Sequence, residues 1–332
     1  MKGHSPQAGP YRARPRPIGA IHRQDCLIRE DPRYDIRMTR RTFVQTTLAA
    51  AAASALPGTA FAQKKLGAIG LQLYSVRGLM KEDLPGTLQK VAAIGFKEVE
   101  FAGLFERSPK DVRGLLDKNG LTSPASHIDW TTVETKLPET IETAKILGQK
   151  FIIVPYVGEA ERKQPDIWKR AVDLFNKTGK ACQQAGLQFA YHQHSFEFVP
   201  SADLGGKLPY DYLLENTDPA LVKMELDLCW TVAAEQDPVA YFNRFPGRFP
   251  LVHVKDWLKD GTSSPAYAGA LGQDSKFTGQ MTSVGAGSID FKRIFAQADK
   301  GGVKHYIVEY DNPKAPIDDL TSSYSFLRNL RF

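Results

Sequence analysis

Strand-like and helix-like runs alternate eight times between residues 67 and 330. The strand-like runs are short and apolar, and the apolar positions in the runs between them recur with the 3.6-residue period of a helix. Several helix-like runs end at a glycine just before the next strand, as at Gly95, Gly120 and Gly186, which is typical of helix C-termini. The strands are expected at 67–74, 97–102, 122–127, 151–154, 188–194, 222–228, 251–255 and 305–309. The helices are expected at 83–94, 110–118, 138–147, 165–184, 210–215, 238–244, 291–298 and 317–330.

Eight strand–helix units in about 265 residues predict an α/β fold, a single (β/α)8 barrel. A doubly wound open sheet is the alternative, but no G-x-G-x-x-G follows the first strand. One connection breaks the rhythm, because residues 256–288 form a long Gly/Ser/Asp-rich stretch after the seventh strand. This stretch is a candidate lid or dimer contact, so a homo-oligomer is compatible with the sequence.

The charge of the chain is concentrated at its N-terminus. The 332 residues carry a formal net charge of +6, and the first 62 hold ten basic against four acidic side chains. The remaining 270 residues carry 33 of each sign and are formally neutral. A neutral body lacks the basic face that nucleic-acid binding needs, so no nucleic-acid partner is expected. With 42% apolar and 24% charged residues, the composition excludes a disordered chain and predicts a globular protein.

The N-terminal segment has the pattern of an export signal. Paired arginines at Arg40 and Arg41 precede a mild, Ala-rich apolar run and an A-x-A site that ends at Ala62. This order predicts a twin-arginine signal peptide that is cleaved after Ala62, with the twin-arginine translocase as partner and a periplasmic location. The apolar run is too short and too rich in alanine for a stable membrane anchor.

The same segment sets the predicted domain boundaries. Residues 1–62 are expected to be an unfolded N-terminal extension followed by the signal peptide, and residues 63–332 to be the barrel. Residues 1–37 show no periodic pattern, and Met38 stands directly before the arginine motif. We therefore hypothesise that translation starts at Met38.

Acidic and imidazole side chains gather at the predicted strand ends. In a barrel, the carboxyl ends of all strands surround one pocket, so side chains there converge. One such residue alone is more often a hydrogen-bonded core residue, but a whole set predicts a site for Mn²⁺, Mg²⁺, Zn²⁺ or Fe²⁺. Strand parity places His192 and His194 on one face, and His253 and Lys255 on another, so each pair can point into the barrel. The strand-end residues are Glu100, His127, His192, His194, Asp227, His253 and Glu309.

Four stretches make the sequence similar to a known family. They are Leu71–Arg77 (LQLYSVR), Tyr191–Phe198 (YHQHSFEF), Glu225–Trp230 (ELDLCW) and Val252–Trp257 (VHVKDW). Together they resemble the xylose isomerase-like TIM-barrel family, also called sugar phosphate isomerase/epimerase. This family includes ketose 3-epimerases, hydroxypyruvate isomerases, inosose dehydratases and apurinic endonucleases. The resemblance extends from residue 66 to residue 330 and implies a TIM barrel.

The resemblance also implies a ligand set for one divalent metal ion. The epimerases of the family hold it with Glu, Asp, His and Glu from the fifth to eighth strands. Asp227, His253 and Glu309 match the last three ligands. The first ligand does not match, because His192 and His194 stand where the epimerases have Glu. One of these two histidines is the expected replacement, and Glu197 in the following loop is another candidate.

The family resemblance implies a metal-dependent sugar isomerase or epimerase. Such an enzyme removes a proton next to a carbonyl and passes through a metal-stabilised enediolate. Glu309 is then the leading base, and His127 or His194 the leading acid. The missing first Glu also suits a lyase or dehydratase acting on keto-sugars or 3-keto-glycosides. A non-enzymatic periplasmic sugar-binding protein is the third alternative, because fold alone does not determine function.

The remaining candidates have two interpretations each. Lys255 can polarise a substrate oxygen or form a salt bridge with a neighbouring acid. Trp230 and Trp257 can form an apolar wall for a sugar ring or belong to the core. Glu100 can bind substrate hydroxyls or pair with an arginine. The sequence leaves these alternatives open.

Overall fold

The computed structural model describes residues 63–259 and 279–332. Ala62–Phe332 form one compact unit. The predicted extension and signal peptide, together with the middle of the 256–288 stretch, lie outside the described residues. Within 63–259 and 279–332, none of the helices combines the length and apolarity that crossing a membrane requires.

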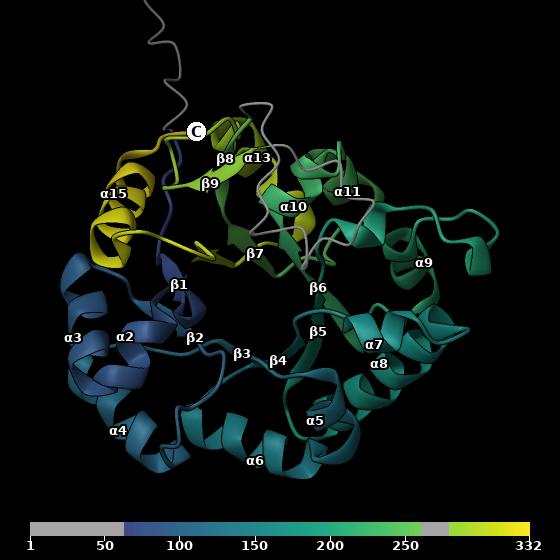
Figure 1. Ribbon diagram of the computed structural model, residues 1–332, viewed down its shortest axis with the longest axis horizontal. Helices are drawn as coiled ribbons and strands as arrows, with labels where there is room; N and C mark the ends of the chain where they lie inside the picture. Colours follow the sequence, from purple (N-terminus) through teal and green to yellow (C-terminus); the bar gives the residue numbers. More distant parts are fainter. Residues whose placement is uncertain (1–62, 260–278) are drawn as a thin grey trace, which may run out of the picture. The chain divides into compact units, whose positions relative to one another are not determined.

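Eight parallel strands form the centre of the molecule, and helices surround them (Figure 1). The strand order is β2-β1-β10-β7-β6-β5-β4-β3, and all neighbouring pairs are parallel. Parallel bridges from Glu98 to Thr122 and from Phe101 to Ser126 join the two ends of this sheet. The fold is therefore a single (β/α)8 TIM barrel, as predicted. The strands are β1 Gly70–Gln72, β2 Glu98–Glu100, β3 Ala125–His127, β4 Phe151–Val154, β5 Gln188–His192, β6 Val222–Asp227, β7 Leu251–Val254 and β10 His305–Val308.

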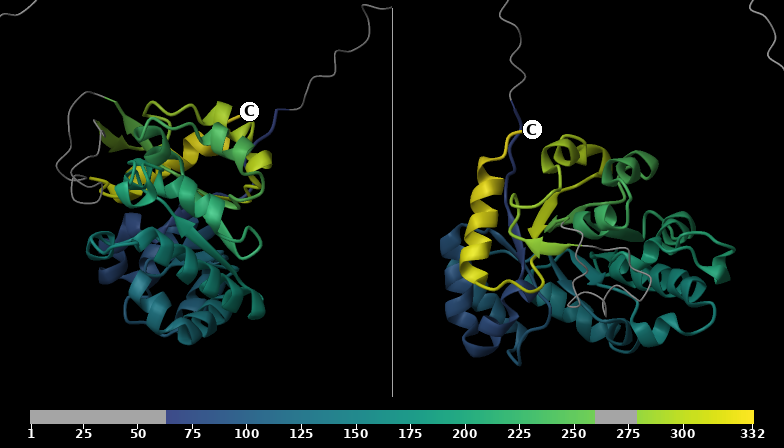
Figure 2. Two further views of the ribbon diagram at one scale, coloured as in Figure 1. Left: turned by 90° about the vertical axis from the view of Figure 1, so that its right-hand side faces the viewer. Right: turned by 45° about the horizontal axis from the view of Figure 1, so that its top comes forward.

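The helices follow the strands and cover the outside of the barrel (Figure 2). α4 shows the local chemistry: Ser108 caps its first turn by accepting a hydrogen bond from the Asp111 N–H, and Gly120 ends it with a φ of 62°. The longer helices are α3 Leu84–Ile94, α4 Pro109–Asn119, α6 Leu137–Leu147, α8 Ile167–Gln184, α9 Pro209–Asn216, α11 Pro238–Arg244 and α15 Pro316–Asn329. The shorter ones are α2 Arg77–Glu82, α5 Trp130–Thr135, α7 Glu159–Arg162, α10 Leu228–Ala233, α13 Phe291–Phe295 and α14 Ala298–Gly301, with 3₁₀ turns at η1 Leu73–Val76, η2 Phe196–Phe198 and η3 Ala202–Leu204.

Several parts of the fold differ from the expectation. The strand predicted at 67–74 is only β1 with a 3₁₀ turn after it, and the strand predicted at 188–194 ends at His192, so His194 follows β5. The helix predicted at 291–298 is two short helices, α13 and α14. The strand predicted to reach residue 228 ends at Asp227, because the Asp227 carboxylate caps α10 by accepting a hydrogen bond from the Trp230 N–H at 2.8 Å. The described ends of the predicted 256–288 loop form an antiparallel hairpin between β8 (Asp256–Leu258) and β9 (Gln280–Thr282).

The barrel interior is built in layers. A small apolar layer consists of Ala125, Ile153, Ala190 and Leu251. Two residues further along β3, β5 and β7 come His127, His192 and His253. Side chains two positions apart on a strand point to the same side, so these imidazoles lie directly above the apolar layer. The sequence thus places an apolar layer directly beneath the polar side chains of the site.

Candidate active site

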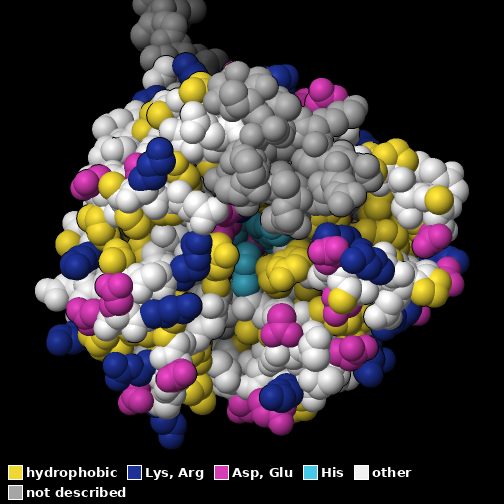
Figure 3. All heavy atoms as spheres, viewed as in Figure 1, with side chains coloured by type: hydrophobic (Ala, Val, Ile, Leu, Met, Phe, Trp, Pro, Cys, Tyr) yellow, Lys and Arg dark blue, Asp and Glu magenta, His cyan; other side chains and the backbone are white. Residues whose placement is uncertain are grey.

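A cavity of about 790 Å³ opens at the carboxyl ends of the barrel strands. Figure 3 shows histidine side chains at the bottom of a hollow near the centre of this face. Five residues predicted from the sequence line the cavity: His127, His192, His194, Lys255 and Glu309. Two exposed tyrosines, Tyr74 and Tyr156, line it as well.

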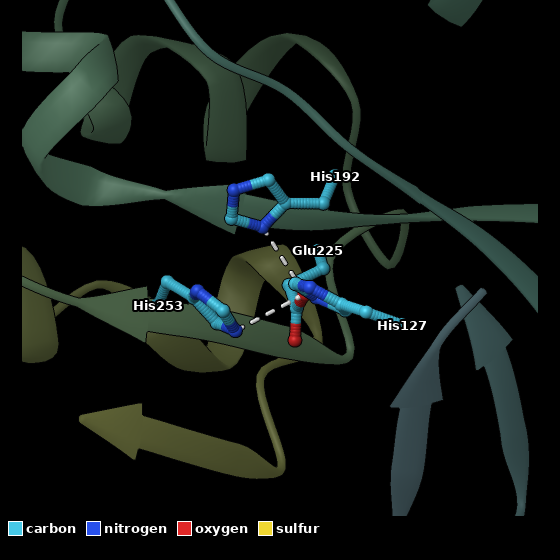
Figure 4. Close-up of side chains that lie close together, drawn as sticks. All are labelled: His127, His192, Glu225 and His253. Carbon is cyan, nitrogen blue, oxygen red and sulfur yellow. Dashed lines mark hydrogen bonds and ion pairs between the residues drawn. The ribbon is translucent and has the colours of Figure 1, made fainter. Parts of the chain in front are cut away.

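Three imidazoles converge on one carboxylate oxygen beneath the cavity (Figure 4). The Oε2 atom of Glu225 lies 2.8 Å from Nε2 of His127, 3.1 Å from Nδ1 of His192 and 3.2 Å from Nε2 of His253. The side chains come from strands β3, β5, β6 and β7. We call His127, His192, Glu225 and His253 the inner set.

Glu100 closes the inner set from below. Its Oε2 atom lies 2.7 Å from Nε2 of His253 and accepts a hydrogen bond from the Gln72 amide at 2.9 Å. The side chain has no exposed surface. Burial and the neighbouring Glu225 raise the pKa of the Glu100 carboxyl. The structure therefore places Glu100 outside the cavity lining, where His253 and Gln72 contact its carboxylate.

A second group of ligand-type atoms lies nearer the cavity. The Oε2 atom of Glu309 lies 2.8 Å from Nδ1 of His253 and 2.7 Å from the Lys255 ammonium. The Oδ2 atom of Asp227 is 3.2 Å from the same ammonium and 3.7 Å from Nε2 of His192. We call His192, Asp227, His253 and Glu309 the outer set, which is the predicted metal site.

The outer set fits a divalent ion. Ligand atoms of Asp227, His253 and Glu309 lie within 4.8 Å of one another. Asp227 Oδ2 is buried and accepts no hydrogen bond from the described residues, and its close contacts are the Lys255 ammonium at 3.2 Å and His192 Nε2 at 3.7 Å. Nε2 of His253 faces Glu100 and Glu225, which leaves its Nδ1 directed to the outer set. A carboxylate on the far nitrogen is the usual support of a metal-binding histidine.

The charge states at the cavity follow from burial and close contacts. Burial alone would lower the pKa of Lys255, but the surrounding carboxylates, led by Asp311 and Glu309, hold it well above its usual value. Burial would raise the pKa of Glu309, but Lys255 and His253 hold it well below the usual value. Burial raises the pKa of Asp227 to about 6, and Lys255 opposes that shift. Lys255 is therefore a cation and Glu309 an anion at neutral pH.

His194 is a neutral imidazole at the cavity wall. Burial, followed by the charges of His192 and Lys255, lowers its pKa well below the usual value. Its Nδ1 atom is buried and has no hydrogen-bond partner among the described residues. Its backbone N–H donates to Glu197 Oε2 at 2.9 Å, and its ring stacks on Trp230 at 5.7 Å between centroids. His194 is thus held from two sides, with a nitrogen left for a ligand.

Besides Glu100, Asp227 and His253, three predicted residues lie outside the cavity lining. Glu197 is completely buried and accepts hydrogen bonds from the Tyr191 hydroxyl and the His194 N–H, so it holds the loop after β5. Trp230 is fully buried behind His194, and Trp257 is 5% exposed on the β8–β9 hairpin. Both tryptophans therefore belong to the core. Neither of them forms a wall of the cavity.

Two functional candidates were missed from the sequence. Glu225 stands two residues before Asp227 on the same strand face, so alternation alone indicated that it points inward. Asp311 follows Glu309 by two residues, lines the cavity and pairs with Lys255 at 3.0 Å. The apolar neighbours of Glu225 gave no sign that three histidines would meet it.

The chain is similar to known proteins in sequence and in fold. A family model described as xylose isomerase-like TIM barrel matches residues 88–330. A curated relative, inosose dehydratase from Geobacillus kaustophilus, is 26% identical over 249 residues, covering 66% of this chain and 79% of the relative. A solved sugar phosphate isomerase/epimerase from Parabacteroides distasonis is 26% identical with a TM-score of 0.62, covering 82% of this chain and 96% of that one.

A more distant solved structure shares the fold. The 3-keto-D-glucoside 4-epimerase from E. coli, in its apo form, is 16% identical with a TM-score of 0.58. The match covers 80% of this chain and all of that one.

Proposed function

This chain belongs to the xylose isomerase-like TIM barrel family, and we propose that it is a metal-dependent enzyme that moves a proton next to the carbonyl of a keto-sugar. One observation carries the proposal. Two proton-accepting side chains, Glu309 after β10 and His194 after β5, flank the strands that carry Asp227 and His253. Both line the same cavity.

The side chains divide the work by charge state. A divalent ion on Asp227, His253 and Glu309 would bind the carbonyl oxygen and a neighbouring hydroxyl and stabilise the negative charge that proton loss creates. Glu309 is ionised and accepts the proton from the carbon next to the carbonyl. Lys255 is charged and lines the cavity, where its ammonium donates a hydrogen bond to a substrate oxygen.

His194 supplies the second proton-transfer group. Because it is neutral and lines the cavity, it can take or return a proton on the side of the cavity that β5 forms. Proton removal on one face and return on the other gives epimerisation, and return at the neighbouring carbon gives isomerisation. His127 is less suited to be the acid, since its Nε2 atom is directed to Glu225.

Dehydration is the second candidate function. The curated relative from Geobacillus kaustophilus is named inosose dehydratase, and a β-elimination needs only one base beside the ion. Glu309 would then remove the proton, and a hydroxyl would leave from the next carbon as water. The sugar-binding alternative is not retained, because the relatives are named as enzymes.

Proton exchange tests the proposal and separates the two reactions. The protein is incubated with a keto-sugar or an inosose in D₂O with Mn²⁺, and the products are followed by NMR. We expect deuterium next to the carbonyl, and its loss by at least about 100-fold in Glu309→Gln. His194→Gln is expected to keep exchange but to lose the epimer if two bases act. Products that have lost one water and gained a second carbonyl would favour dehydration, and absence of exchange with every ketone would refute the proposal.

A further inference from the structure

The inner set has the features of a metal site, and it shares His192 and His253 with the outer set. Its ligand atoms lie within 4.8 Å of one another, and they come from four adjacent or nearly adjacent barrel strands. Such strands hold their side chains more rigidly than loops do. His192, Glu225 and His253 are at most 1% exposed. Three ring nitrogens aimed at one carboxylate oxygen form the cradle that a small cation would enter (Figure 4).

His253 and His192 each have one ring nitrogen directed to each set, so each can be assigned as a ligand of one ion. His253 presents Nδ1 to Glu309 in the outer set and Nε2 to the carboxylates below. His192 presents Nδ1 to Glu225, at 3.1 Å, and its Nε2 is further, at 3.7 Å, from Asp227. We therefore assign His253 to the outer ion and His192 to an inner ion. The outer ion then keeps Asp227, His253 and Glu309 as its ligands. This assignment leaves His127 Nε2, His192 Nδ1 and Glu225 Oε2 as three ligands for the inner ion.

Unpaired oxygens support an inner ion independently of the imidazoles. Oε1 of Glu225 and Oε1 of Glu100 are both buried, and neither accepts a hydrogen bond from the described residues. A buried carboxylate oxygen without a partner costs free energy, so native proteins rarely leave two in contact with one cluster. A cation that both carboxylate oxygens of Glu225 bind would also satisfy Oε1.

The balance of buried charge points the same way. Glu100, Glu225, Asp227 and Glu309 are at most 6% exposed, and Lys255 is the buried amino group that contacts this cluster. With one divalent ion in the outer set, the four carboxylates and Lys255 keep a net charge of −1. Asp311, which also pairs with Lys255, adds another negative charge. A second divalent ion would balance these two negative charges while the histidines stay neutral.

We propose that His127, His192 and Glu225 hold a second divalent ion beneath the outer set. The inner ligands are mostly imidazoles, which favour Zn²⁺, Co²⁺ or Fe²⁺, whereas the outer set is richer in carboxylates and also accepts Mn²⁺ or Mg²⁺. The inner ion stands on its own residues and does not depend on the reaction proposed above. Its role is to fix Glu225, which in turn orients His253.

Metal counting on matched variants tests the inner site. The purified full-length protein is freed of metal with a chelator, reloaded with Zn²⁺, dialysed and analysed for ions per chain. We expect two ions in the wild type, one in His127→Gln, one in Glu225→Gln and one in Asp227→Asn. His305→Gln is the control, because His305 pairs with Glu98 at the other end of its strand and is expected to keep two ions. Circular dichroism melting of each variant checks folding.

The outcomes separate the inner ion from the proposed reaction. One ion that is lost in Asp227→Asn but kept in His127→Gln and Glu225→Gln would overturn the inner site and leave the proposed function standing. One ion with the reverse pattern would support the inner site and remove the outer ion on which the proposed function rests. A single ion lost in all three variants would mean one shared site and would overturn the second ion. No ion in the wild type would overturn both the inner ion and the outer ion.

Discussion

At the scale of single residues, Glu197 shows how burial changes a carboxyl group without direct contact with the cavity. Burial raises its pKa to about 7, although the Tyr191 hydroxyl and the His194 N–H both donate to it and oppose the shift. The neutral form is therefore favoured in the folded protein. Because the folded pKa lies above the unfolded one, this group's stabilisation is complete below about pH 4.5 and is lost as pH rises to about 7.

The substitution Glu197→Gln keeps the shape of the side chain and removes its titration. The wild type is expected to lose about 3 kcal/mol of unfolding free energy relative to this variant between pH 4.5 and pH 7. Urea unfolding of both proteins across that range measures the difference. Parallel profiles for the two proteins would show that the Glu197 pKa is not raised.

At the scale of elements, one side chain anchors the segment after β9 to the first residue of β8. The Asp256 carboxylate accepts hydrogen bonds from the backbone N–H groups of Gly285 at 2.9 Å, Gly287 at 3.1 Å and Ile289 at 3.2 Å. Asp256 is 1% exposed, so water does not replace these bonds. Gly287 is required there, because a Cβ on it would lie 2.2 Å from Asp256 Oδ1.

Removing that anchor should loosen residues 283–289 selectively. Asp256→Ala is expected to cost about 2 kcal/mol and to speed hydrogen exchange at Gly285, Gly287 and Ile289. Hydrogen exchange followed by mass spectrometry measures this, with β4 as the internal control. Equal exchange in the variant and the wild type over 283–289 would contradict the anchor.

Elements with a local signal were predictable and elements defined by tertiary contacts were not. The run at 151–154 was placed correctly because a buried parallel strand is a continuous apolar run. α10 was missed because it begins where the Asp227 side chain turns back to the Trp230 N–H. The β8–β9 pairing was missed because its two strands are separated by more than twenty residues without an alternating pattern.

The same distinction holds within the candidate site. His192 and His194 were expected on one strand face, and their rings lie 5.2 Å apart, both lining the cavity. The meeting of three histidines at Glu225 could not be predicted, because it depends on the stagger between β3, β5, β6 and β7. Strand periodicity predicts which face of the strand a side chain lies on, but its position along the barrel axis depends on how the strands are staggered in the closed barrel.

At the scale of the whole molecule, the sequence divides into a basic N-terminal segment and a neutral body. We propose that residues up to Ala62 direct export through the twin-arginine translocase and are then removed. N-terminal sequencing of the exported protein should give Gln63 as its first residue. Replacing Arg40 and Arg41 by lysine should retain the precursor in the cytoplasm. Mature protein outside the cytoplasm in that variant would contradict this route.

Metal-dependent proton transfer is the central claim, and its most direct test is one comparison in D₂O. Deuterium incorporation next to the carbonyl of a keto-sugar is measured by NMR for chelator-treated protein, with and without added Mn²⁺, and for Asp227→Asn. The account predicts exchange that is absent in the metal-free protein, returns with Mn²⁺ and stays absent in Asp227→Asn. Undiminished exchange in the metal-free protein and in Asp227→Asn would contradict it.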